Sequence, residues 1–445
     1  MAQKVPPPGV GAEEYARRRQ RAMEAIGDGV MILAAGTAPT YSNDTHYRFR
    51  PESNFFFLTG YPEEQAVAVL RPGADAPYTL FVRPRNEEAE IWTGRRFGPE
   101  GARREFGADA AFEIGELADK LPDLLDGATT LYYQPWAQRS LDRIVRGTLE
   151  ALRGKERFGK IAADTLVRPG ALLDEMRLIK SAADMEVLAR ACEISATGHL
   201  AGLAACRPGC MEFEIQAAIE HAFVRAGASG AGYPSIVGAG DSGCILHYIE
   251  NNRQVAEGDL VLVDAGAEIG GFTGDITRTY PASGSFTAPQ RRLYEIVLET
   301  LEQGIAMARP GQTIDGIHEA SLKRLSEGLL ELGLLDGSLD EVMEKESYKR
   351  YYMHRTSHWL GMDVHDVGRY RKDGACRPLR EGMVFTIEPG LYVQPGDERA
   401  PEEFRGLAVR LEDDVLITAD GCRNLTRRVP VEPDAVAALV GRTDS

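Results

Sequence analysis

Hydrophobic and polar positions in the first third of the chain follow two different periods. Apolar side chains spaced at helical intervals among Arg and Glu predict an amphipathic helix from Glu13 to Ile26. Short apolar runs bounded by Gly, Pro, Asn and Asp predict strands at residues 30–34, 55–58, 66–70, 78–82 and 130–133, with a helix at 117–125. This pattern predicts a smaller α/β domain over residues 1–172, in which no catalytic cluster is apparent.

The remaining residues, 173–445, predict an α+β domain. Ser181, with Asp184 three residues later, is typical of a helix N-cap and opens a long helical pattern. Apolar strand patterns fill the intervals between the later helices. Those helices are predicted at 212–226, 290–308 and 314–332. The boundary between the two domains is expected near Arg168-Pro169-Gly170, where Pro and Gly interrupt the helical and strand patterns of hydrophobic residues.

Part of the second domain occurs twice. Residues 257–266 read Glu-Gly-Asp-Leu-Val-Leu-Val-Asp-Ala-Gly, and residues 381–390 read Glu-Gly-Met-Val-Phe-Thr-Ile-Glu-Pro-Gly. In each copy an apolar strand ends on a carboxylate, and a histidine segment lies upstream. A duplicated half-domain would bring the two strand ends together around a pseudo-two-fold axis and gather four carboxylates at one centre.

The first copy contains two aspartates joined by a glycine-rich turn. Asp264 ends one apolar strand and Asp275 begins the next, so a tight hairpin would place them side by side. Two adjacent carboxylates repel each other unless a cation lies between them. Thr277, on the same face as Asp275, is a candidate supporting donor. Taken singly, each acid could be a solvated turn residue, because Asp and Glu are mostly exposed in proteins.

The second copy adds two carboxylates and a cluster of histidines. Glu388 and Glu412 both follow apolar, strand-like runs, where an uncompensated buried charge is costly. Three of the chain's eight histidines, His354, His358 and His365, lie just upstream. Four carboxylates and one imidazole form a hard ligand set for two divalent ions, Mn²⁺ first, with Co²⁺, Fe²⁺ or Zn²⁺ as alternatives. Such ions lower the pKa of a water and stabilise a tetrahedral intermediate.

Charge and composition narrow the possible partners. The formal net charge of −16 argues against a nucleic-acid partner, which would require a basic surface. No apolar run approaches the roughly 20 residues of a membrane span. The first eight residues lack the apolar core of a signal peptide, and the six scattered cysteines are typical of reduced thiols. We therefore expect a cytoplasmic protein that does not bind membranes.

The order and context of the candidate ligands resemble those of a known family, the creatinase/methionine-aminopeptidase (pita-bread) metallopeptidases. Within it, the Xaa-Pro aminopeptidases (aminopeptidase P) are the most similar. The motifs that carry the resemblance are Gly243-Cys-Ile-Leu-His247-Tyr, Ser357-His358-Trp-Leu-Gly-Met-Asp-Val-His365-Asp-Val-Gly and Thr386-Ile-Glu388-Pro-Gly-Leu-Tyr392. The resemblance covers about residues 176–430, and the first domain is similar to the N-terminal domain of that family. It implies a pita-bread dimetal catalytic domain over residues 173–445.

The resemblance also implies a role for each matching residue. The ligands of two metal ions would be Asp264, Asp275, His358, Glu388 and Glu412, with Asp275 and Glu412 shared between the ions. Glu388 would also take the proton from the attacking water. His247, His354 and His365 would bind substrate and stabilise the oxyanion. Arg410 and Tyr392 match positions beside the metal or substrate, Tyr233 matches a pocket-side position, and Trp92 matches a residue that reaches a neighbouring subunit's active site. Trp92 could equally be a packing residue of the first domain.

The implied function is a metalloaminopeptidase that hydrolyses the N-terminal Xaa-Pro bond of peptides as a homo-oligomer, a dimer or a tetramer. One alternative is prolidase, which shares the metal ligands but cleaves only Xaa-Pro dipeptides. A non-catalytic binding module on the same fold and a metal-free amidinohydrolase like creatinase are further alternatives, both disfavoured by the complete ligand set. The sequence departs from the family at Arg355, where relatives commonly have Gly after the histidine, so the shape of one substrate subsite is open.

Overall fold

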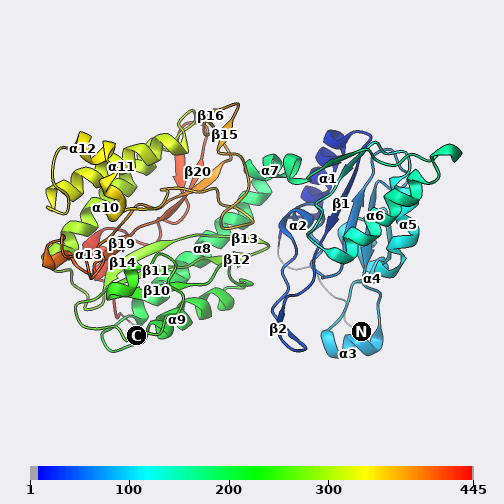
Figure 1. Ribbon diagram of the computed structural model, residues 1–445. Coiled ribbons are helices and arrows are strands. Elements are labelled where there is room, and N and C mark those ends of the chain that lie inside the picture. Colours follow the sequence, from blue (N-terminus) through cyan, green and yellow to red (C-terminus); the bar gives the residue numbers. More distant parts are fainter. Residues whose placement is uncertain (1–8, 443–445) are drawn as a thin grey trace. The chain divides into compact units, whose positions relative to one another are not determined.

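The computed structural model describes residues 9–442, and the chain divides into two compact units on either side of the Met176–Arg177 bond (Figure 1). The predicted boundary between residues 172 and 173 falls inside a helix, α7 (Gly170–Leu178). The segment 1–8, for which the sequence predicts no signal peptide, lies outside the described residues. No helix within residues 9–442 is both long enough and apolar enough to cross a membrane.

The first unit is built on a six-stranded mixed sheet. The strands of the whole unit are β1 (Val30–Ala34), β2 (Thr40–Ser42), β3 (Thr45–His46), β4 (Val67–Leu70), β5 (Tyr78–Val82), β6 (Ala110–Glu113), β7 (Thr130–Tyr132) and β8 (Thr165–Val167). Its helices are α1 (Ala12–Ile26), α2 (Ser53–Thr59), α3 (Glu87–Thr93), α4 (Gly98–Phe106), α5 (Leu117–Leu125) and α6 (Arg139–Arg153), with short 3₁₀ helices η1 (Ile114–Glu116) and η2 (Glu156–Phe158). The strand order is β6-β5-β4-β1-β7-β8, while β2 and β3 form a separate hairpin.

One predicted strand of this unit is wrong. The apolar run at 55–58 lies in helix α2, where the Glu52 carboxylate accepts the Phe55 N–H as an N-cap. Gly60 ends the helix in the left-handed conformation, with φ of 64°. The side chains of Phe55, Phe56 and Phe57 are all buried, so the run has no polar face whose spacing could distinguish a helix from a strand.

The second unit places strands between two pairs of helices. Its helices are α8 (Ala182–Ala205), α9 (Glu212–Arg225), α10 (Ala288–Met307), α11 (Ile314–Glu331), α12 (Leu339–Glu344) and α13 (Pro433–Ala437), with η3 (Gly240–Cys244), η4 (Ser347–Arg350) and η5 (Glu402–Phe404). Its strands are β9 (Gly230–Ala231), β10 (Ile236–Ala239), β11 (Leu260–Asp264), β12 (Ala267–Ile269), β13 (Phe272–Thr273), β14 (Thr277–Pro281), β15 (Arg371–Lys372), β16 (Ala375–Cys376), β17 (Val384–Ile387), β18 (Gly390–Tyr392), β19 (Ala408–Arg410), β20 (Asp413–Ile417) and β21 (Cys422–Asn424). Helix α8 packs on α9 and on β12 and β13 (Figure 1). Helix α10 packs on α11 and on β17, β18 and β19.

The helices of this unit begin close to the positions that the sequence predicts. Ser181 and Asp184 form the predicted capping box of α8, each side chain accepting the other residue's main-chain N–H. The later predicted helices appear as α9, α10 and α11, with ends within two residues of the expected ones. This mixture of helix and sheet confirms the α+β class predicted for the second domain.

The sequence repeat corresponds to two equivalent strand pairs. In the first copy β11 pairs antiparallel with β14, and in the second β17 pairs antiparallel with β20. Asp264 ends β11 while Asp275 precedes β14; likewise Glu388 follows β17 while Glu412 precedes β20. Each copy therefore places one carboxylate at or just after the end of a strand and another just before that strand's partner. The predicted glycine turn is a hairpin of β12 and β13 inside the β11–β14 pair.

A buried arginine joins the two copies. Thr277 and Glu412 form an isolated antiparallel bridge between them. Beside it, the fully buried Arg278 guanidinium donates to the Asp413 carboxylate at 2.6 Å and to the main-chain oxygens of Glu412 and Thr277 at 2.7 and 2.9 Å. Its remaining two N–H groups donate to the carbonyls of Val429 and Pro430. All five donors of this side chain are therefore satisfied without water.

We predict that Arg278→Met lowers the free energy of unfolding by about 3–5 kcal/mol, because it leaves the buried Asp413 carboxylate without its cation. The measurement is urea denaturation of the metal-free protein. The control is Arg428→Met, whose side chain is 53% exposed, and which should change stability by no more than about 0.5 kcal/mol. Equal unfolding midpoints for the two variants would show that the Arg278 contacts do not hold the copies together.

Candidate active site

A cleft of about 950 Å³ in the second unit brings the predicted site residues together. All five predicted metal ligands line it, and so do three further histidines, Tyr233 and Arg410. Tyr392 lies behind this surface and reaches the cleft through hydrogen bonds to His354 and Arg410. Trp92 does not line the cleft: it lies on α3 of the first unit with 83% of its surface exposed. That exposure argues against the alternative that Trp92 packs in the core of its own domain.

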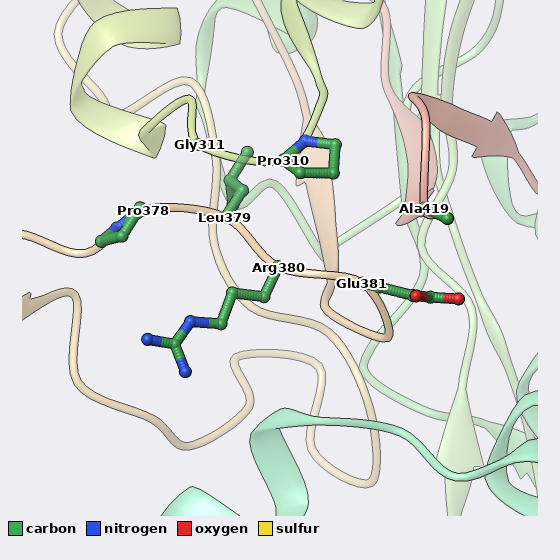
Figure 2. A pocket seen from close by; sticks show the side chains of 7 residues that line it. All are labelled: Pro310, Gly311, Pro378, Leu379, Arg380, Glu381 and Ala419. Atoms are coloured by element: carbon green, nitrogen blue, oxygen red, sulfur yellow. The ribbon is translucent and has the colours of Figure 1, made fainter.

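A second hollow in this unit, of about 470 Å³, has a different character. It lies where the segment before α11 pairs with the segment before β17, through a hydrogen bond from the Gly311 N–H to the Leu379 carbonyl. Its charged lining residues, Arg380 and Glu381, extend in different directions (Figure 2). It therefore presents no converging set of acids and bases, and the larger cleft is the candidate active site.

The carboxylates of the first copy face one another across a tyrosine. The Tyr233 hydroxyl donates to Asp264 Oδ1 at 2.7 Å and also lies in hydrogen-bonding contact with Asp275 Oδ1. A hydroxyl has only one proton, so it cannot satisfy both carboxylates at once. Burial raises the pKa of Asp275, and the nearby Asp264 raises it further, while contact with His358 opposes both. This pair of acids is stabilised by any added positive charge.

His358 presents a ring nitrogen to the carboxylates of both copies. Its Nδ1 lies 3.1 Å from the Trp359 carbonyl oxygen, which makes Nδ1 the N–H and leaves the Nε2 lone pair exposed to the cluster. Nε2 lies 3.4 Å from Asp275 Oδ2, 3.7 Å from Glu388 Oε1 and 4.0 Å from Glu412 Oε1. An imidazole lone pair facing carboxylates is a donor set that fits a divalent cation and otherwise requires a proton.

Electrostatics show how strongly the cluster requires positive charge. Burial raises the pKa of Glu388 to about 7, although His358 and Arg410 act against it. Burial and the neighbouring Asp275 and Glu388 raise the pKa of Glu412 well above its ordinary value. For His358, burial lowers the pKa but the contacts with Asp275 and Glu388 outweigh it and raise the pKa to about 9. In the metal-free protein, protons are therefore retained where cations would otherwise lie.

A chain of hydrogen bonds connects the first copy to the substrate side of the cleft. Arg410 donates through Nη2 to Asp264 at 2.7 Å and through Nη1 to the Tyr392 hydroxyl at 3.0 Å. That hydroxyl lies 2.9 Å from His354 Nε2, and His354 Nδ1 lies 2.8 Å from the Arg355 carbonyl oxygen. Burial and the nearby Arg410 lower the pKa of His354 to about 3, so the ring is neutral. With the His354 proton on Nδ1, each hydrogen bond in this series, from Arg410 to the Arg355 carbonyl, has one donor and one acceptor.

The other two predicted histidines lie at the open side of the cleft. His247 and His365 are exposed, and the His365 ring contacts the His358 ring edge-on with centroids 4.3 Å apart. His365 is followed by Asp366, a buried carboxylate that forms ion pairs with Arg177 at 2.5 Å and Lys180 at 3.0 Å. These two buried ion pairs hold the His365 segment against the end of α7.

Two polar contacts at the site were only partly foreseen from the sequence. Thr277, expected as a supporting donor, donates its hydroxyl to Glu412 Oε2 at 2.7 Å. Asp414, which the strand pattern places on the same face as Glu412, accepts the Asp275 main-chain N–H at 2.9 Å and the Cys192 thiol at 3.3 Å. The Asp414 contact orients a carboxylate of the first copy through a residue of the second. Only its position in the run Glu412-Asp-Asp indicated it.

Comparisons with known proteins agree with this geometry. The family model for metallopeptidase family M24 matches residues 186–419, and that for the aminopeptidase P N-terminal domain matches residues 15–132. The chain is 42% identical over 435 residues to an Xaa-Pro aminopeptidase of Escherichia coli strain K12, covering 97% of this chain and 98% of that protein. The chain belongs to metallopeptidase family M24. It is therefore a metal-dependent hydrolase, which sets aside the alternative of a non-catalytic binding module.

Solved structures of aminopeptidases have the same fold. The structure of Pseudomonas aeruginosa aminopeptidase PepP superposes with a TM-score of 0.95 at 42% identity, covering 97% of this chain and 98% of the other. A zinc-substituted E. coli aminopeptidase P in complex with product gives a TM-score of 0.95 at 41% identity, covering 98% and 100%. These likenesses confirm the predicted pita-bread fold and the expected relationship to Xaa-Pro aminopeptidases.

We predict that the metal-free protein loses thermal stability as pH rises from about 5 to 9. The raised pKa of Glu388, about 7, and that of His358, about 9, mean that the folded state binds more protons than the unfolded state between the ordinary and raised values. Stability conferred by those protons is lost as pH increases through that window. The measurement is the melting temperature of chelator-treated protein at stepped pH.

Two variants distinguish the contribution of the site to this pH dependence from that of titrating groups elsewhere on the surface. Glu412→Gln should flatten the pH dependence, because it removes one of the repelling carboxylates. Glu381→Gln, an exposed position outside the cleft, should leave it unchanged. A metal-free wild type whose melting temperature is constant or increases over this range would contradict the prediction.

Proposed function

We propose that the chain is an Xaa-Pro aminopeptidase that hydrolyses the bond between the N-terminal residue of a peptide and a proline at the second position. The observation that carries the proposal is the convergence of Asp275, His358 and Glu412, whose ligand atoms lie within 4.8 Å of one another between the two copies. The relatives that match nearly the whole chain are named as Xaa-Pro aminopeptidases, which supports the same substrate class here.

The proposed cofactors are two divalent metal ions, with Mn²⁺ as the first candidate and Co²⁺, Fe²⁺ or Zn²⁺ as alternatives. The residues that would hold them are Asp264, Asp275, His358, Glu388 and Glu412. Four oxygen ligands to one imidazole favour a hard or borderline cation over one that prefers thiolates. When bound, such ions supply Lewis-acid activation of the scissile carbonyl and lower the pKa of a water.

Side chains of the protein would carry out proton transfer and substrate binding. Glu388 is the proposed base, because its Oε1 lies 3.7 Å from His358 Nε2 and so places a carboxylate beside the position of the ions and of the water they would activate. His354 is neutral and held by Tyr392, so it can bind the substrate without adding charge. His247 and His365, at the cleft surface, complete the set of groups that contact the substrate and its oxyanion.

Arg410 and Tyr233 position other residues of the site through hydrogen bonds. Arg410 contacts Asp264 and Tyr392 together, so it couples a ligand carboxylate to the substrate side. The Tyr233 hydroxyl contacts both first-copy aspartates, Asp264 and Asp275. The arrangement suits the imide bond before proline, which lacks an N–H and is rigid, because activation here acts on the carbonyl and the water rather than on an amide hydrogen.

The proposed setting is the cytoplasm, in a homo-oligomer. All six cysteines lie within residues 9–442 and carry free thiols, in keeping with a reducing compartment. In the oligomer, the exposed Trp92 would reach a neighbouring subunit's active site. Light scattering that gave the mass of a monomer at working concentration would contradict this part of the proposal.

We predict that an Ala-Pro-Ala tripeptide is cleaved after its first residue, and that this cleavage distinguishes the protein from a prolidase. An aminopeptidase leaves the peptide beyond proline free to extend from the cleft, whereas a prolidase requires the proline carboxylate at that place. Product analysis by chromatography with Ala-Pro-Ala and Ala-Pro as substrates makes the comparison. Cleavage of the dipeptide alone would identify a prolidase instead.

We predict that Glu388→Gln lowers kcat for this tripeptide by about 10²–10⁴-fold, because it removes the proposed base. The change keeps the side chain's shape, so the melting temperature of the metal-free protein should not fall. Glu381→Gln is the control and should retain wild-type activity. Metal analysis of the loaded wild type should give two divalent ions per chain, and equal rates for wild type and Glu388→Gln would refute the assigned base.

A further inference from the structure

Two arginines lie at the edge of the cleft on opposite sides of one carboxylate. Arg355 directly follows His354 in the chain, Arg371 lies on β15, and Asp315 lies in the first turn of α11. One Asp315 oxygen accepts from Arg355 Nη2, and the other accepts from Arg371 Nη2 at 3.1 Å. All three residues line the cleft that contains the candidate metal ligands. We call Arg355 and Arg371 the arginine pair.

The arginine pair carries positive charge that Asp315 does not neutralise. Two guanidinium groups face one carboxylate, so this part of the cleft has a net charge of about +1, in a chain whose formal net charge is −16. The side chains of Arg355 and Arg371 are 57% and 65% exposed. Each guanidinium has five N–H donors and gives one nitrogen to Asp315, so donors remain for a ligand.

The arginine pair lies at the edge of the cleft, where the peptide segment after proline would extend into solvent. An aminopeptidase takes the free N-terminus and the scissile bond to its reacting groups, so residues after proline extend toward solvent. Ile314 and Tyr370, neighbours of Asp315 and Arg371, line the same stretch of the cleft and provide apolar surface for that segment. A carboxylate on the leaving segment would then meet the arginine pair.

We propose that the arginine pair is a specificity subsite for a carboxylate on the substrate beyond its proline. The proposal rests on the Xaa-Pro aminopeptidase function above and adds a substrate preference to it. The same chemistry has two sources: the C-terminal carboxylate of a short peptide, or an acidic side chain in a longer one. Asp315 binds both guanidinium groups, one through each of its oxygens, so it keeps two groups that bind carboxylates close to the same point of the cleft.

The side-chain role of Arg355 can be separated from its main-chain role. The His354 ring contacts the carbonyl oxygen of Arg355, and this contact remains after a change of side chain. Arg355→Gln and Arg371→Gln therefore remove charge without removing the partner of His354. Lys372→Gln is the matched control, because Lys372 is the next residue on β15, is exposed, and does not line the cleft.

The test compares kcat/KM for Ala-Pro-Ala and for its C-terminal amide in the metal-loaded enzyme. We expect the wild type to prefer the free acid, and each arginine variant to lower kcat/KM for the acid by about fivefold, through KM, while changing the amide by less than twofold. The preference of the wild type should decrease with added salt, because the pair is exposed. Lys372→Gln should behave as wild type.

Each other outcome overturns the proposal or identifies the source of the carboxylate. An arginine variant that slows acid and amide equally would show a positioning role and overturn the subsite, as would an unchanged ratio of the two rates. A wild type that cleaves neither peptide would refute the proposed function itself. Tetrapeptide amides with Glu or Gln after proline form the second arm: a preference for Glu that Arg355→Gln abolishes assigns the subsite to acidic side chains as well.

Discussion

The second unit depends on one electrostatic constraint: carboxylates from both copies of a repeat are buried against one another. Asp264 and Asp275 come from the first copy, and Glu388 and Glu412 from the second. Burying like charges together is unfavourable unless positive charge accompanies them. Burial accordingly raises the pKa of Asp275, Glu388 and Glu412, and the contact with carboxylates raises that of His358. The fold holds these groups where divalent cations would offset their repulsion.

The surrounding structure holds that unfavourable arrangement in place. Arg278 joins the two copies by donating to main-chain oxygens of both and to Asp413. Asp414 orients Asp275 across the same junction, and Thr277 does so for Glu412. Because the first copy presents two of the five candidate ligands and the second copy presents the other three, the candidate site is complete only when the copies are in register. The contacts that stabilise the junction therefore also set the geometry of the candidate site.

The cleft separates groups that face the carboxylate cluster from groups that face the substrate. His358 points its Nε2 at the cluster, whereas the neutral His354 is bound to Tyr392 and through it to Arg410. Farther out, Arg355 and Arg371 share Asp315 and give the edge a positive charge. Charge thus changes sign along the cleft, from the carboxylates at the reacting end to the arginine pair at the edge.

Local rules in the sequence determined the elements and the composition of the site. The capping residues Ser181 and Asp184, the repeated strand that ends on Asp264 or Glu388, and the histidine spacing all act over short distances, so they can be read directly from the chain. The run at 55–58 was misread because it is buried on every side and has no polar face to reveal its period. Tertiary structure alone decided the pairing of Thr277 with Glu412, the bond from Asp275 to Asp414 and the meeting of Arg355 with Arg371 at Asp315. Most of these contacts join residues far apart in the chain, whose register depends on how strands and helices pack rather than on any local pattern.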